Sequence, residues 1–175
     1  MFSHMAVMYG NALYQRGLID EGYKVLDGLY RHCQNFEVSR MYPGLPEYIS
    51  PRGRGMYPYL TGAASWYLLT LVTEVFGVKG VLGDLTLRPR LVTAQFDVTG
   101  RASVSTLFAG RLLTVIYLNS AGVGPDLYHI AEIALDGEAV QFDRRSETIV
   151  IARQTIAGLD ANQSHTVEIS LTPKR

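Results

Sequence analysis

The sequence is poor in cysteine and in net charge. Cys33 is the single cysteine, which excludes an intramolecular disulfide and a cysteine-based zinc cluster. Charged residues make up only 18% of the 175 residues, and sixteen Lys plus Arg balance sixteen Asp plus Glu. The chain therefore lacks the excess positive charge with which nucleic-acid binders attract phosphate backbones. We expect no nucleic-acid partner and no metal site.

Long apolar runs are also missing. The longest, between residues 68 and 78, is interrupted by Thr70, Thr73 and Glu74, and the N-terminus has no basic segment followed by an apolar stretch. We therefore expect a soluble, cytoplasmic protein without a membrane partner. The length fits one domain or two small ones.

Apolar residues before residue 78 recur with helical spacing. The first helix is expected to end near Gly17 and to bury one stripe of side chains, formed by Met5, Met8, Tyr9, Ala12 and Leu13. A second helix, capped by Asp20, shares a face among Tyr23, Leu26, Leu29, Tyr30 and Cys33. The short connection predicts an antiparallel helical hairpin.

Residues 34–60 hold four of the seven prolines, which predicts a long irregular loop of the kind that often lines a binding site. A third helix is expected after Thr61 and to stop at Gly77. Its residues 66–76 are apolar on nearly every side, which predicts burial between neighbouring elements.

From residue 85 the pattern has period two. Asp136-Gly137 is a hairpin turn pair, and Val167, Ile169 and Leu171 alternate with polar residues. About eight short strands predict an antiparallel β-sandwich or jelly roll. The fold class is therefore α+β, and because three widely apolar helices cannot cover one another, the chain reads as part of something larger or as an oligomerising subunit.

Few residues suggest chemistry by type and position. His4 lies at a helix start, where it can help bind an anion or can be an ordinary terminal residue. Thr61-Gly62 offers open backbone N–H groups at the third helix, or a routine N-cap. Glu47 lies in the proline-rich loop and can reach a cavity, and Tyr57 belongs to a group of loop aromatics that suits either sugar stacking or core packing.

Three segments, 2–9, 55–66 and 77–89, resemble motifs of the glycoside hydrolase family 94 phosphorylases, such as the cellobiose, cellodextrin and laminaribiose phosphorylases. The resemblance implies that residues 1–77 are the last helices of an (α/α)6 catalytic barrel and that residues 78–175 are a C-terminal β-sandwich. It also implies an inverting reaction, in which phosphate cleaves a β-glucoside to a sugar 1-phosphate.

The resemblance assigns phosphate binding to His4, Thr61 and Gly62, and a substrate loop to Glu47 and Tyr57. Inorganic phosphate is then a co-substrate and no cofactor is implied. The family's general-acid Asp belongs to a segment preceding these motifs, so no catalytic residue is assigned and the chain is expected to be inactive alone. Two alternatives remain: a carbohydrate-binding or scaffolding sandwich that oligomerises through its helices, and one subunit of a split phosphorylase.

Overall fold

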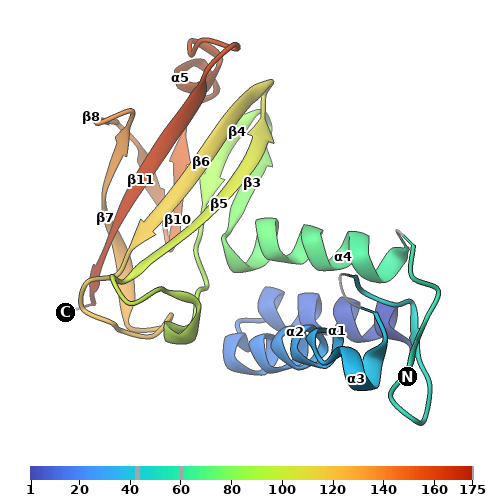
Figure 1. Ribbon diagram of the computed structural model, residues 1–175. Coiled ribbons are helices and arrows are strands. Elements are labelled where there is room, and N and C mark those ends of the chain that lie inside the picture. The colour runs from blue at the N-terminus through green and yellow to red at the C-terminus, as the bar shows by residue number, and fades with distance from the viewer. Residues whose placement is uncertain (42–43, 60, 175) are drawn as a thin grey trace. The chain divides into compact units, whose positions relative to one another are not determined.

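The computed structural model describes residues 1–41, 44–59 and 61–174, which form two compact units (Figure 1). The first unit is Met1–Glu74 and the second begins at Val75, next to the boundary predicted after residue 77. Helices dominate the first unit and strands the second, so the chain belongs to the α+β class. None of the helices in the described part of the chain has the length and apolar character needed to span a bilayer.

In its described residues the first unit contains four α-helices, and the last of them runs on into a π-helical turn that ends at the start of the second unit. Their bounds are α1 Ser3–Gln15, α2 Ile19–Gln34, α3 Phe36–Ser39, α4 Gly62–Thr70 and the π turn η1 Leu71–Val75. The loop predicted to be irregular contains α3 and a short antiparallel hairpin. The two strands of this hairpin have two residues each, β1 Tyr48–Ile49 and β2 Gly55–Met56. Gly17 ends the first helix as predicted, with a left-handed φ of 80°.

Glycine allows α1 and α2 to approach each other closely. A side chain at Gly22 would bring its Cβ within 2.6 Å of the Tyr14 ring, and one at Gly10 would lie 3.3 Å from Leu26. A buried hydrogen bond of 3.1 Å from the Asn11 amide to the Thr70 hydroxyl links α1 to α4. Small and polar residues therefore form much of the contact face of α1.

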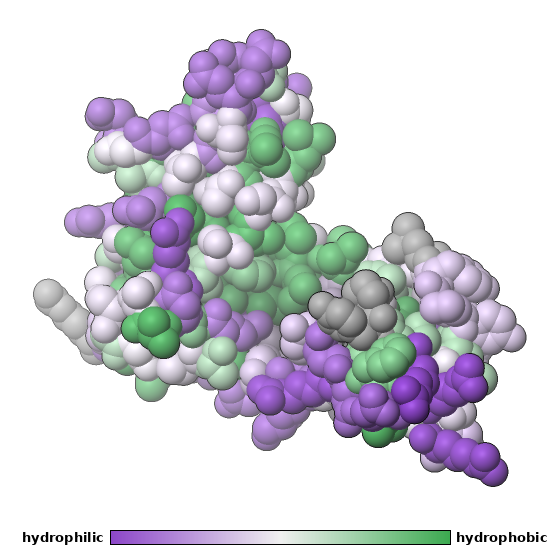
Figure 2. Space-filling view, in the orientation of Figure 1, coloured by the Kyte–Doolittle hydropathy of each residue, from purple (hydrophilic) through white to green (hydrophobic). Residues whose placement is uncertain are grey.

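The apolar stripe predicted for the first helix is not its buried face. Leu13 is buried, but the side chains of Met5 and Tyr9 are 57% and 60% exposed. Nor is α4 buried on every side, since Leu68 and Leu69 are 60% and 48% exposed. Close packing at the glycines decides which face turns inward, so apolar side chains are left among hydrophilic ones at the surface (Figure 2).

The second unit contains two larger sheets. The four-stranded sheet has the order β3-β4-β10-β9, with bounds Val78–Val81, Asp84–Leu87, Thr148–Ile151 and Asp143–Arg145. The five-stranded sheet has the order β5-β6-β11-β7-β8, with bounds Arg101–Phe108, Arg111–Leu118, Ser164–Pro173, Tyr128–Leu135 and Glu138–Ala139. A 3-10 turn, η2 Thr93–Gln95, and a short helix, α5 Arg153–Ala157, complete the unit.

Both larger sheets contribute fully buried apolar side chains, among them Leu85 and Ile149 from one and Val115 and Ile169 from the other. The predicted Asp136-Gly137 turn joins β7 to β8 with both φ angles positive. The predicted antiparallel arrangement is wrong at one pair, because β11 runs parallel to β6. The Arg111 guanidinium, at the start of β6, donates to the carbonyls of Ala157 and Leu159 and so holds the connection that leads into β11.

A buried histidine pairs with this turn. His165 Nδ1 lies 2.6 Å from an oxygen of Asp136, and its Nε2 lies 2.8 Å from the Asp160 carbonyl. Both neighbours are acceptors, and only the protonated imidazole can donate to both. Asp136 and the Asp160 carbonyl therefore raise the pKa of His165 above 6.5, while the Thr166 N–H and His165 lower the pKa of Asp136 below 3.8.

This pair predicts a pH window for the stability of the second unit. The contribution of His165 to the free energy of unfolding is present below pH 6.5 and is lost as pH rises through the raised pKa of His165. The contribution of Asp136 is lost as pH falls through the lowered pKa of Asp136. We expect His165→Asn to lower the melting temperature most at pH values between the lowered pKa of Asp136 and the raised pKa of His165, and less at alkaline pH. Thermal unfolding from pH 3 to pH 9, with His129→Asn as the control, checks this; an effect that is constant with pH would contradict it.

Candidate functional site

The start of α1 is joined to the segment that carries Glu47. The Ser3 N–H donates to the Glu47 carbonyl at 2.9 Å, and Phe2 forms an isolated antiparallel bridge with Tyr48. These backbone contacts span more than forty positions of sequence. They place the Glu47 side chain next to His4, in the first turn of α1.

The Glu47 carboxylate lies between His4 and the N-terminus of α4. One oxygen is 3.3 Å from His4 Nδ1, and the other accepts the Ala63 N–H at 3.0 Å. Burial raises the pKa of the carboxyl, but the Thr61 hydroxyl, the Ala63 N–H and His4 outweigh this effect and hold the pKa below its ordinary value. A negative charge is therefore stabilised at this position.

Gly62 leaves room for the His4 ring. A Cβ at this position would lie 2.3 Å from His4 Nδ1 and Cε1, far inside van der Waals contact. The ring therefore packs directly on the backbone at the start of α4. This contact explains why the first residue of this helix has no side chain.

Three buried polar atoms of this region make no hydrogen bond of standard geometry to any residue that the structure describes: Ser3 Oγ, His4 Nε2 and Thr61 Oγ1. The Thr61 hydroxyl is nevertheless near enough to Glu47 to lower the pKa of its carboxyl. Buried polar groups are normally satisfied, and exceptions gather where a ligand or an ion binds. Hydroxyl groups, an imidazole and the N-terminus of a nine-residue helix together suit an oxyanion.

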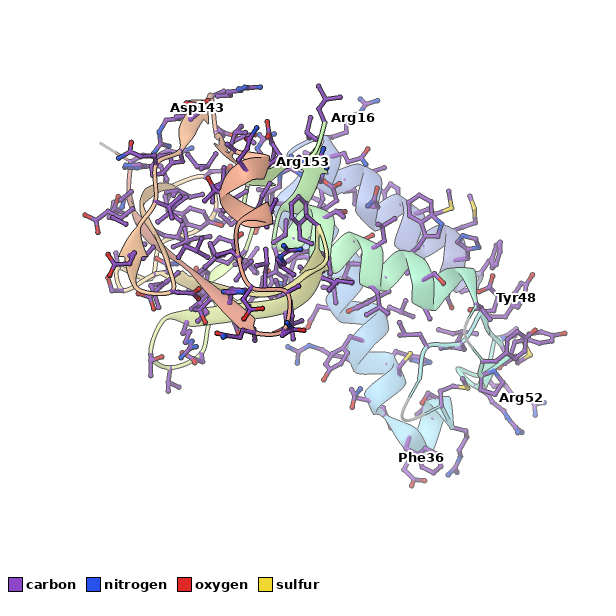
Figure 3. The ribbon with its side chains drawn as sticks, turned by 90° about the horizontal axis from the view of Figure 1, so that it is seen from above. Arg16, Phe36, Tyr48, Arg52, Asp143 and Arg153 are labelled. Atoms are coloured by element: carbon purple, nitrogen blue, oxygen red, sulfur yellow. The ribbon has the colours of Figure 1, made fainter. Side chains whose placement is uncertain are left out.

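A row of exposed aromatic rings begins beside His4. Phe2 stacks on Tyr48 with 4.9 Å between the ring centroids, Tyr48 meets Tyr57 at 5.7 Å, and Tyr57 meets Tyr59 at 6.2 Å. In Figure 3, Tyr48 lies beside the ends of α1 and α4. We call these four residues the aromatic row. Its rings are 37% to 63% exposed, so they are open to a ligand with an apolar face.

Of the residues singled out from the sequence, the structure brings together His4, Glu47, Thr61 and Gly62. Tyr57 is connected to them through the aromatic row and through its carbonyl, which accepts the Glu47 N–H at 3.5 Å. Its φ is 60°, an unusual value for a bulky residue, and such strain tends to be retained at functional positions.

Sequence reasoning missed Ser3 and Ala63. Ala63 contributes a backbone N–H, which only the start of α4 reveals, and Ser3 contributes a buried hydroxyl without a sequence signal. Among the residues that the structure describes, no three His, Cys, Asp or Glu side chains gather in a group that could hold a metal ion. No protein-family model matches the chain, and no curated protein matches it in sequence.

Proposed function

We propose that this chain is the C-terminal part of an inverting glycoside phosphorylase. Residues 1–77 would be the last helices of an (α/α)6 barrel, and residues 78–175 a jelly-roll-like C-terminal sandwich. The main support is one observation: at the start of α4, His4, the Thr61 hydroxyl and the Ala63 N–H lie around the carboxylate of Glu47. Gly62 leaves room for the His4 ring, which comes from a distant part of the sequence. A group of donors that stabilises a carboxylate also suits phosphate.

The chemistry asked of these residues is to bind and orient. In phosphorolysis a phosphate oxygen attacks the anomeric carbon and the glycosidic bond breaks, which yields a sugar 1-phosphate and a free sugar. His4, the Thr61 hydroxyl and the first N–H groups of α4 would hold the attacking phosphate and stabilise its charge. The proton for the leaving oxygen would come from an acid supplied by another part of the barrel.

The exposed apolar residues of the helices support an incomplete barrel. Met5 and Tyr9 of α1, with Leu68 and Leu69 of α4, are each about half exposed or more. At about 25 cal/mol per Å², covering such side chains stabilises association by several kcal/mol. We propose that the remaining barrel helices, a split partner or a second copy of the chain covers them.

Calorimetry with inorganic phosphate and with sulfate tests the site. We expect the chain to bind both anions, and His4→Ala and Thr61→Val each to weaken binding about tenfold, because each removes a hydrogen bond to a charged group. His129→Ala, in the second unit, is the matched control and should bind as the unmodified chain does. Binding that neither site variant weakens would contradict the proposal.

The aromatic row favours a second candidate, a carbohydrate-binding module. We expect Tyr57→Ala to weaken cellobiose binding severalfold, since a ring stacked on a sugar contributes about 1 kcal/mol. Tyr30→Ala is the control, because that ring on α2 is 49% exposed and lies outside the row. Titrations with and without phosphate, followed by tyrosine signals in NMR spectra, separate the candidates: affinity independent of phosphate favours the module.

A further inference from the structure

The Glu47 carboxylate occupies the donors that phosphate would use. Its two oxygens take the His4 ring nitrogen and the Ala63 N–H, at 3.3 Å and 3.0 Å. We propose that Glu47 is a resident anion that competes with phosphate, so that phosphate binds only when this carboxylate leaves. The proposal rests on the proposed function and specifies how that site is regulated.

The two anions cannot share these donors. His4 Nδ1 and the backbone of Ala63 each present one N–H at most, so a phosphate oxygen must replace a carboxylate oxygen at each. If both anions stayed within hydrogen-bonding distance, their like charges would also repel in a largely buried site. A phosphate that binds through His4 Nδ1 and the Ala63 N–H therefore competes with the Glu47 carboxylate.

Displacement requires only that the side chain rotates. The Glu47 backbone is held in place by the hydrogen bond from Ser3, at 2.9 Å. Its side chain is 16% exposed and therefore has an edge in contact with solvent. The carboxylate can swing outward about its own side-chain bonds without a change in the hairpin that follows it.

The variant Glu47→Gln tests whether the Glu47 carboxylate competes with phosphate or only supports the structure of the site. The Gln amide has the shape of the Glu carboxylate and its oxygen can still accept a hydrogen bond from the Ala63 N–H. Because the amide is uncharged, it binds the His4 and Ala63 donors more weakly. We expect this variant to bind inorganic phosphate at least tenfold more tightly than the unmodified chain in calorimetry. Glu37→Gln makes the same change in net charge at an 81% exposed side chain and should bind within twofold of the unmodified chain.

Phosphate binding by Glu47→Gln that is no tighter than that of the unmodified chain overturns this proposal and leaves the proposed function standing. No binding by either chain overturns both. If Glu47→Gln is unfolded at the assay temperature, the comparison moves to thermal unfolding. At matched ionic strength, phosphate should raise the melting temperature of Glu47→Gln more than that of the unmodified chain, and equal rises would overturn the proposal.

Discussion

Gly62→Ala is expected to weaken phosphate binding at the candidate site strongly while the helical unit stays folded. The added methyl group would lie 2.3 Å from the His4 ring. The ring is the end of a movable side chain, so it can rotate away at modest cost, but it then loses Glu47 and the α4 N-terminus. A charge-assisted hydrogen bond contributes about 1.5–3 kcal/mol, so we expect phosphate affinity to fall roughly ten- to a hundredfold.

Gly28→Ala is the control for this change. A Cβ at Gly28, on α2, would meet nothing within 4 Å, and alanine is the better helix former there. Calorimetry should show normal phosphate binding for this variant, and circular dichroism should show helical structure in both. A Gly62→Ala chain that binds phosphate as tightly as the unmodified one would mean that the position of the His4 ring does not matter.

Gly77→Ala is expected to destabilise the second unit more than any other change considered. Gly77 has a φ of 66°, and a Cβ there would lie 1.8 Å from the Arg88 carbonyl oxygen. The two residues are already joined by a hydrogen bond from the Arg88 N–H to the Gly77 carbonyl, at 2.9 Å. Backbone cannot rotate away as a side chain can, so we expect a loss of about 3 kcal/mol or more in the free energy of unfolding.

Comparison with Gly137→Ala separates the steric part of the expected loss in the free energy of unfolding from the conformational part. Gly137 also has a left-handed φ, 88°, but a Cβ there would meet nothing within 4 Å. It should therefore show only the conformational penalty, about 1–2 kcal/mol. Urea denaturation followed by far-UV circular dichroism compares the two, while fluorescence of Trp66, the single tryptophan, follows the helical unit. Equal losses would contradict the close contact at Gly77.

The alternation of apolar and polar residues, together with the residues typical of turns, predicted much of the second unit. The alternation at Val167, Ile169 and Leu171 is confirmed by their burial, and so is the Asp136-Gly137 turn. The direction of β11 was not predictable in this way, because parallel and antiparallel strands can show the same alternation. Strand order depends on contacts distant in sequence.

The helical unit shows where hydropathy fails. The buried side of α1 depends on Gly10 and Asn11, whose small size and hydrogen bond count for more than the apolar character of Met5 or Tyr9. The position of Glu47 was likewise beyond the sequence, because it depends on backbone pairing with Ser3, forty-four positions away. His4, Thr61 and Gly62 were candidates by residue type and position, but only a family resemblance joined them into one site, and spacing alone would not have done so.

The place of β11 in its sheet affects how the chain is made. This strand lies between β6 and β7, yet it follows every other strand in the sequence. While a ribosome is still synthesising the chain, β6 and β7 must each leave one edge unpaired until β11 emerges. Unpaired edges are templates for aggregation. A growing chain therefore exposes two strand edges until its last strand is made, and a premature stop before β11 would leave β6 and β7 without the strand that joins them.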